Sequence, residues 1–559
     1  MLPENASSRN TEINLLHTLA RLYRVQTTYV DAAGKLRESS PEGIVCVLRA
    51  LGAPLASFAD VGEALRLRRR ELWQRGMDAV LLAWDGRLPP VRLRTAAGLG
   101  DRDVAYEVIL ENGTRLTGRC ADAGVEAEKE IDGCRYVARR LVVPETFPLG
   151  YHRLFLQTGK RGFEAYLFSS PRRAYGEPGS RTWGVFSPVY ALSSEKSWGA
   201  GDFSDLQTLS RWVDEQGGDV VATLPLLAGF LDEPFNPSPY APVSRLFWNE
   251  LYLDVLRIPE FERCPVARAV ARSAAFRAEV ELERASSLID YRRVMRLKRM
   301  VLEELARCFF KDPTERREQF DGYLQSHPRL EDYAAFRAKT ERERAPWFFW
   351  PEAARNGRLA GADYDEAAKR YHLYVQWQAD QQMSAFRRGS GDSGSALYLD
   401  FPLGVNRDGY DVWRERSVFA LQASGGAPPD LFFTKGQNWG FPPLQPEALR
   451  RQGYRYYIES LRHHLRYSGM LRIDHVIGLH RLYWVPDGCD PADGVFVRYP
   501  AEEFYAVLNL ESHRHQARIV GENLGTVPAY VNAALAEHNI HGMYVGQFEI
   551  APDEETAVR

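Results

Sequence analysis

Carboxylate side chains stand near the ends of three short apolar runs in the second half of the chain. Asp400 lies near the end of ALYLDF, Asp474 follows MLRI, and Glu522 follows ARIVG. The catalytic groups of α/β barrels project from the carboxyl ends of their strands, so these positions are candidates for chemistry. Two carboxyl groups about 5 Å apart are the arrangement of retaining glycosidases, in which one attacks the anomeric carbon and the other protonates the leaving oxygen. Asp474 and Glu522 are the candidates for that pair.

An arginine stands beside the first of these two carboxylates. Arg472 is two residues before Asp474, so on one strand both side chains point to the same face. The arginine can then keep the aspartate ionised and orient it, as a carboxylate nucleophile requires. Other interpretations stay open, because an Asp beside an Arg is also typical of a structural salt bridge, and a Glu after a strand is also typical of a helix cap. His475, His463 and His464 fit structural or surface histidines, and no HExxH or comparable spacing supports a metal.

The elements that must position these residues follow a strand and helix alternation from Thr182 onward. Amphipathic helical stretches such as DFSDLQTLSRWVDEQG separate apolar strand candidates, which indicates a parallel sheet and favours a (β/α)8 barrel. Charged helical sequence at about residues 255–390 predicts a long insertion between the second and third strands. The six predicted strands are 183–190, 219–226, 396–405, 470–479, 517–524 and 543–550.

Two smaller regions precede the predicted barrel. Residues 1–75 contain helical patterns, among them SPEGIVCVLRALG, which begins with Ser-Pro and stops at Gly52. Residues 76–170 change to short alternating runs such as AVLLAW, AYEVIL and HRLFLQ, separated by turn sequences, which predicts a small antiparallel β domain. The remainder, residues 171–559, is predicted to be the catalytic barrel.

Composition argues against several classes of protein. The 71 basic and 74 acidic residues give a formal net charge of −3, so a basic nucleic-acid footprint is absent. The longest apolar stretch, Val220–Leu231, is interrupted by Thr, Pro and Gly and is shorter than the roughly 20 residues of a membrane helix. The first residues show no basic and apolar signal pattern, so we expect a cytoplasmic protein. The six cysteines have no CxxC spacing, which predicts free thiols.

A set of longer motifs resembles one enzyme family closely. The sequence is similar to the amylomaltases, which are 4-α-glucanotransferases of glycoside hydrolase family 77, and the resemblance extends from the N-terminal helical segment onward, as in the longer bacterial members. The motifs that carry it are SWGAGDFSDL at 197–206, NPSPYAPVSRLFWNELYLDV at 236–255, GAPPDLFFTKGQNWGFPPL at 426–444, RIDH at 472–475, YWVPDG at 483–488 and GENLGTVP at 521–528.

The resemblance implies a fold, a mechanism and a set of site residues. It implies a barrel of the α-amylase kind and a double displacement, with Asp474 as the nucleophile that forms a β-glucosyl enzyme and Glu522 as the general acid and base. It also implies a substrate-binding set, in which aromatic faces stack on glucose rings and carboxylates accept bonds from sugar hydroxyls. That set is Arg472, Tyr240, Asp400, Asp430, Trp439 and His475.

This sequence departs from the family pattern at two places. Asn523 stands where the family usually has Asp after the catalytic Glu. The family's third catalytic carboxylate, an Asp after the seventh strand, has no counterpart up to Arg559. Together with the count of six strands, this predicts that the last two barrel strands are absent from this chain.

The function expected from these residues is transfer of α-1,4-glucan segments between maltooligosaccharides by a retaining mechanism. The alternatives are an inactive or partial α-glucan-binding protein and an α-glucoside hydrolase. A mechanism with two carboxylates requires neither a metal nor an organic cofactor. The expected partners are maltooligosaccharides and α-1,4-glucans, with no nucleic acid and no membrane. The preferred chain length, the balance of transfer and hydrolysis and the oligomeric state stay open.

Overall fold

The structure, a computed structural model, describes residues 4–31, 33–97, 103–176, 181–311, 315–386 and 394–549. The chain divides into two compact units. Unit 1 is Met1–Gly176, Ser417–Ile458 and Ile473–Arg559, and unit 2 is Glu177–Arg416 and Glu459–Arg472. The boundary between Arg472 and Ile473 falls inside strand β18 (Met470–Ile473).

Unit 1 begins with helices, as the helical patterns of residues 1–75 predicted: α1 (Glu4–Leu22), α2 (Pro41–Ala50) and α3 (Val61–Gln74). The predicted start of α2 is confirmed, because the Ser40 hydroxyl accepts a hydrogen bond from the Gly43 N–H and Pro41 occupies the first turn. The helix stops before Gly52, whose φ of +87° suits glycine. The hairpin of β1 (Thr28–Val30) and β2 (Leu36–Glu38), between α1 and α2, was not predicted, because strands of three residues give almost no periodic signal.

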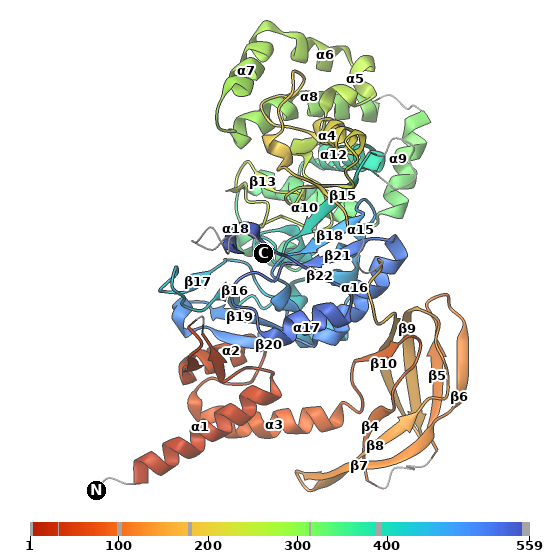
Figure 1. The fold of residues 1–559 in the computed structure, drawn as a ribbon, viewed down its shortest axis with the longest axis vertical. Coiled ribbons are helices and arrows are strands. Elements are labelled where there is room, and N and C mark those ends of the chain that lie inside the picture. Colours follow the sequence, from red (N-terminus) through yellow and green to blue (C-terminus); the bar gives the residue numbers. More distant parts are fainter. Residues whose placement is uncertain are drawn as a thin grey trace, which may run out of the picture. The chain divides into compact units, whose positions relative to one another are not determined.

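A two-layer β region follows in unit 1 (Figure 1). One sheet has the order β3-β10-β9-β5-β6 and the other the order β4-β8-β7. The pairs are antiparallel, as predicted, except that β3 runs parallel to β10. Alternate residues of both sheets, such as Leu93, Val108 and Leu154, form one buried apolar cluster between the layers. The strands are β3 (Val80–Trp84), β4 (Val91–Ala96), β5 (Ala105–Ile109), β6 (Arg115–Arg119), β7 (Ala121–Ile131), β8 (Cys134–Val142), β9 (Gly150–Thr158) and β10 (Arg161–Ser170).

The later segments of unit 1 carry parallel strands and a second antiparallel sheet. The end of β18 lies beside β21 (Arg518–Gly521), which pairs in parallel with β22 (His541–Gly542). Helices α16 (Ala501–His515) and α17 (Ala529–Glu537) precede and follow β21. The second sheet, which sequence analysis did not predict, has the order β17-β16-β19-β20. Its strands are β16 (Ala423–Ala427), β17 (Gln437–Asn438), β19 (Arg481–Pro486) and β20 (Val495–Arg498), and α14 (Pro446–Arg451) follows β17.

Two strand predictions in unit 1 need correction. The predicted strand over 543–550 is wrong, because pairing with β21 takes place at His541–Gly542 and residues 546–549 form the short helix α18 (Gly546–Glu549); Ile550 lies outside the described residues. The predicted strand over 470–479 stops at Ile473. His475 has a φ of +48°, a left-handed conformation that ends the extended backbone, and a turn of 3-10 helix over Val476–Leu479 follows.

Unit 2 contains the other parallel strands. β11 (Gly184–Phe186), β12 (Val220–Ala222) and β15 (Ala396–Phe401) lie side by side in this order, within three of the predicted strand ranges. The Gly469 N–H donates to the Leu397 carbonyl at 2.9 Å, which brings the start of β18 beside β15. Helix α4 (Phe203–Glu215) connects β11 to β12, and the Asp202 carboxylate caps its first turn. Whether two further barrel strands are missing stays a prediction.

Helices fill most of the predicted insertion in unit 2. They are α5 (Glu260–Arg263), α6 (Pro265–Arg272), α7 (Ala274–Ala285), α8 (Tyr291–Lys311), α9 (Glu315–Ser326), α10 (Leu330–Glu343), α11 (Glu352–Arg355) and α12 (Glu366–Met383), and α13 (Tyr410–Arg414) follows β15. The prediction of six free thiols is wrong for Cys264 and Cys308, which form a disulfide with a Cα–Cα distance of 6.1 Å. The two cysteines are 44 residues apart, and only the packing of α5 and α6 on α8 brings them together.

Among the described residues, no helix combines the length and the apolar character that a membrane span requires.

Candidate active site

Three hydrogen bonds within unit 1 join the two candidate catalytic segments. The Glu522 N–H donates to the Ile473 carbonyl, and the Val476 N–H donates to the Glu522 carbonyl, each at 2.9 Å. The His475 N–H donates to Glu522 Oε2, also at 2.9 Å. The backbone on both sides of Asp474 is therefore bonded to Glu522. The two segments that carry Asp474 and Glu522 are therefore neighbours along the backbone.

The Glu522 carboxylate is held at both oxygens by backbone N–H groups. His475 donates to Oε2, and Leu524, in the loop after β21, donates to Oε1 at 2.8 Å. Its side chain is half-buried, as is that of Asp474. The helix-cap interpretation of Glu522 is not met, because α17 begins only after Pro528. Such fixed orientation suits a group that must meet a reacting atom in one geometry.

His475 supports this arrangement with an uncommon backbone conformation. Its left-handed φ of +48° costs of order 1–3 kcal/mol in a residue other than glycine, and such costs concentrate at functional sites. This conformation lets consecutive N–H groups, of His475 and Val476, reach the side chain and the carbonyl of Glu522. Burial lowers the pKa of the His475 imidazole, against the opposing effect of the Glu522 and Asp474 charges. The ring is therefore neutral near pH 7.

Trp439 and Asp430 line the same cavity as His475, which has a volume of about 230 Å³. The Trp439 ring meets the His475 ring edge to face, with centroids 5.1 Å apart, and its indole N–H donates to Gln437 Oε1 at 3.1 Å. Asp430 Oδ1 accepts hydrogen bonds from the Phe432 and Phe433 N–H groups, so its own loop holds it in place. An indole face beside a carboxylate is suited to a sugar ring and its hydroxyls.

The remaining three predicted residues form a cluster in unit 2. Asp400, at the end of β15, is 4% exposed. Its Oδ2 accepts a hydrogen bond from the Tyr240 hydroxyl and its Oδ1 one from Arg472 Nη1, each at 2.7 Å. Arg472, which we expected to orient Asp474, thus donates to a carboxylate 72 residues away, and Asp474 itself lies just beyond the end of β18 rather than on the strand.

Comparison with known proteins identifies the family. Residues 187–558 match the family described as 4-alpha-glucanotransferase, glycoside hydrolase family 77, and residues 77–171 match the MalQ N-terminal beta sandwich domain. The chain belongs to this 4-alpha-glucanotransferase family.

Relatives of this glucanotransferase cover most of the chain. The 4-alpha-glucanotransferase of Mycobacterium tuberculosis is 32% identical over 560 residues, which cover 95% of this chain and 75% of the relative. That of Haemophilus influenzae is 34% identical over 428 residues, 72% of this chain and 61% of the relative.

Solved structures confirm the fold class of the glucanotransferase. Amylomaltase from Corynebacterium glutamicum superposes with a TM-score of 0.82 at 29% identity, covering 97% of this chain and 76% of that one. Amylomaltase from Streptococcus agalactiae superposes with a TM-score of 0.56 at 23% identity, covering 67% and 75%. The predicted family and α/β fold class are confirmed.

Asn523, the residue after Glu522, connects three segments of unit 1. Its Nδ2 donates to Asn532 Oδ1 of α17 at 2.8 Å, and its Oδ1 accepts from the Met543 N–H, just after β22, at 2.7 Å. Gly542 leaves the room that this side chain needs, since a Cβ there would lie 2.8 Å from Asn523 Nδ2. The residue after Glu522 therefore anchors the end of β21.

Proposed function

We propose that this chain is an active amylomaltase that moves α-1,4-glucan segments between maltooligosaccharides, with Asp474 as nucleophile and Glu522 as general acid and base. The observation that carries the assignment is the bonding of Glu522 to the backbone on both sides of Asp474. Membership of the glucanotransferase family supports the reaction class.

The proposed reaction has two displacements. In the first, an Asp474 oxygen attacks C1 of the donor glucosyl residue as the bond from C1 to the glycosidic oxygen breaks, and Glu522 gives its proton to that oxygen. In the second, the 4-hydroxyl of an acceptor attacks C1 of the glucosyl enzyme, Glu522 takes the hydroxyl proton, and the bond from C1 to Asp474 breaks. Two inversions at C1 restore the α configuration.

The other predicted residues are proposed to bind the glucan. Trp439 would stack on a glucose ring and Asp430 would accept from its hydroxyls, as their place beside His475 in one cavity supports. Tyr240 and Arg472 hold Asp400 between them, which fixes the position of a carboxylate that can accept hydrogen bonds from sugar hydroxyls. Neutral His475 can donate one hydrogen bond and accept another.

Chromatography of maltotriose incubated with the purified chain tests the assignment. We expect a ladder of longer maltooligosaccharides together with glucose or maltose. Asp474→Asn and Glu522→Gln should each lower the rate of transfer at least about 1,000-fold, because each removes a group that reacts in the transition state. Asp490→Asn, at an exposed aspartate 16 residues beyond Asp474, is the matched control and should transfer at the wild-type rate.

Other products would contradict the proposal. Release of glucose without any longer product would identify an α-glucoside hydrolase. Calorimetric binding of maltooligosaccharides without any product would identify a glucan-binding protein. Undiminished transfer by Asp474→Asn would refute the assigned nucleophile.

A further inference from the structure

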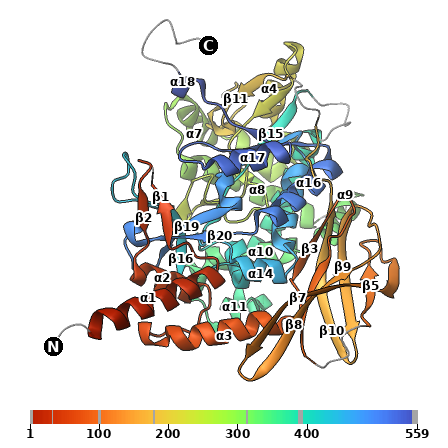
Figure 2. The same ribbon diagram turned by 60° about the horizontal axis from the view of Figure 1, so that its bottom comes forward.

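The cavity that Trp439 and His475 line has a second wall from the N-terminal segment. Val30 and Asp31, at the tip of the β1–β2 hairpin, line it, as does Arg481 at the start of β19. These residues are about 450 positions apart in the chain, and Figure 2 shows the hairpin beside β19 and β16 within unit 1. None of them belongs to the motifs that carry the family resemblance.

The hairpin is fixed to the sheet that carries Arg481. The Gln26 N–H donates to the Phe496 carbonyl at 2.8 Å, and the Arg498 N–H donates to the Arg24 carbonyl at 2.9 Å, so the chain before β1 pairs with β20. The Tyr29 ring meets the Phe496 ring edge to face, with centroids 5.4 Å apart. The wall is therefore already in place before any ligand binds.

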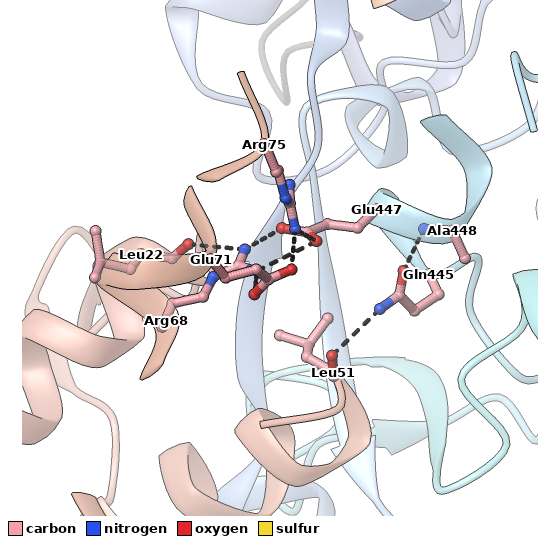
Figure 3. Close-up of polar contacts among 8 residues, drawn as sticks. All are labelled: Leu22, Leu51, Arg68, Glu71, Arg75, Gln445, Glu447 and Ala448. Atoms are coloured by element: carbon pink, nitrogen blue, oxygen red, sulfur yellow. Dashed lines mark hydrogen bonds and ion pairs between the residues drawn. The ribbon is translucent and has the colours of Figure 1, made fainter. Parts of the chain in front are cut away.

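The helices that follow the hairpin are anchored as well. Figure 3 shows Arg68 of α3 and Arg75, just after α3, converging on the Glu447 carboxylate of α14. It also shows Gln445 Nε2 donating to the Leu51 carbonyl, just after α2, at 3.3 Å. Arg68 is 4% exposed. A partly buried ion pair between these segments holds α3 against the residues that follow β17.

Hydrogen bonds hold the side chain of Asp31, at the end of β1, in place. Asp31 Oδ1 accepts hydrogen bonds from the Ala33 and Lys35 N–H groups, each at 2.9 Å, and Oδ2 accepts from Arg37 Nε at 2.8 Å. Both oxygens of the Asp31 carboxylate are therefore hydrogen-bonded within the turn. The contact that this side of the cavity offers a ligand is the apolar side chain of Val30. Val30 is 53% exposed and open to a ligand.

Arg481 brings hydrogen-bond donors to this wall. Its guanidinium lies over the Phe496 ring, 4.3 Å from the centroid. Arg481 Nη1 donates a long hydrogen bond, of 3.4 Å, to Gln26 Oε1. A planar guanidinium held on an aromatic face keeps further N–H groups for a ligand in one orientation.

We propose that Val30 and Arg481 form a glucan subsite next to Trp439, in which Arg481 donates to sugar hydroxyls and Val30 covers an apolar face of the ring. Guanidinium donors beside aromatic rings and an apolar contact suit a neutral polyhydroxylated ring. The volume of about 230 Å³ is below the roughly 300–1,000 Å³ of pockets for drug-sized ligands, which fits one glucosyl residue. The inference rests on the proposed function, because its ligand is the α-1,4-glucan substrate.

Calorimetric titration with maltose through maltoheptaose tests this subsite in a Glu522→Gln parent, which binds glucans without turning them over. A subsite adds affinity only once the glucan is long enough to reach it. In the parent, affinity should therefore increase at the glucan length that first reaches the subsite, and we expect Arg481→Met to remove this increase. Glucans of that length or longer should bind about tenfold more weakly, and shorter glucans less than twofold more weakly. Val30→Asp should weaken the same glucans at least threefold.

Matched control variants separate this effect from general damage. Arg498→Met changes an exposed arginine on neighbouring β20, and Val125→Asp changes a valine on β7 that is 50% exposed, close to the 53% of Val30. Both should bind every glucan as the parent does. Val30 is exposed enough that its substitution leaves folding intact, even if Arg481→Met does not fold.

Each remaining outcome overturns the inference. Unchanged binding at every length in Val30→Asp and Arg481→Met would show that the hairpin wall contacts no sugar. Equal weakening at all lengths would show a structural role alone. In both cases transfer by the wild-type chain would leave the proposed function standing, whereas a parent that binds no maltooligosaccharide would contradict that function too.

Discussion

Substitution of Glu447 by glutamine tests the anchor of the N-terminal segment. Burial alone would raise the pKa of the Glu447 carboxyl, but the hydrogen bonds and charges of Arg68 and Arg75 outweigh burial and hold the pKa at about 2 (Figure 3). The difference from the ordinary value of 4.5 is about 2.5, which at about 1.36 kcal/mol for each pKa unit corresponds to about 3.4 kcal/mol.

Two features reduce that figure. The Glu447 side chain is 22% exposed, so solvent screens the interaction in part. Arg68 also keeps a second partner in Glu447→Gln, because its Nη1 lies 2.7 Å from Glu71 Oε2. We therefore expect the free energy of unfolding to fall by about 2 kcal/mol at pH 7, below the roughly 3–5 kcal/mol lost when a fully buried pair is broken.

The same pKa fixes the pH dependence. In the unfolded chain the carboxyl titrates near its ordinary value, so the stabilisation is complete above about pH 4.5 and is lost as the pH falls toward 2. Urea unfolding followed by circular dichroism should therefore show that the difference in free energy of unfolding between wild type and Glu447→Gln becomes smaller as the pH falls over this range.

The control is Glu63→Gln, which removes an exposed ion pair with Arg66 and should leave the free energy of unfolding nearly unchanged. Two results would refute a stabilising role of the Glu447 ion pair. One is a Glu447→Gln protein as stable as this control at pH 7, and the other is a difference in free energy of unfolding from wild type that does not become smaller in acid.

Three further predictions concern other parts of the chain. Asn523→Leu should lower the rate of transfer at least tenfold, because both hydrogen bonds of the residue after Glu522 are lost. Asn523→Asp still accepts from the Met543 N–H, so its rate should stay within about threefold of the wild-type rate. Equal rates of the two variants in maltotriose assays would count against a positioning role. Burial lowers the pKa of His464 to about 4, so between pH 6.5 and 4 this histidine binds a proton in the unfolded chain but not in the folded chain. The free energy of unfolding should therefore fall by about 3 kcal/mol over that range, and by less in His464→Gln. Parallel pH curves of melting temperature for the two proteins would disprove this. Thiol titration of the unreduced, denatured chain should find four thiols, rising to six after reduction, and six from the start would show that Cys264 and Cys308 are not bonded.

Local sequence determined much of the fold. The Ser-Pro start of α2, the glycine after it and the alternation of the β region are properties of neighbouring residues, because caps and side-chain periodicity act over a few positions. The same holds for the strand ends that carry Asp400 and Glu522. The motifs around Asp474 and Glu522 likewise placed the chain in its family.

Tertiary structure decided which of these residues meet. The donation of Arg472 to Asp400, 72 positions away, the bond between Cys264 and Cys308, and the cavity shared by Val30 and Arg481 all depend on packing between distant segments. The apolar run at 543–550 does not form a strand, because the residues that pair with β21 are His541–Gly542, before the run begins. Spacing along a chain predicts which face a side chain occupies, but its partner depends on loops and packing that carry no periodic signal.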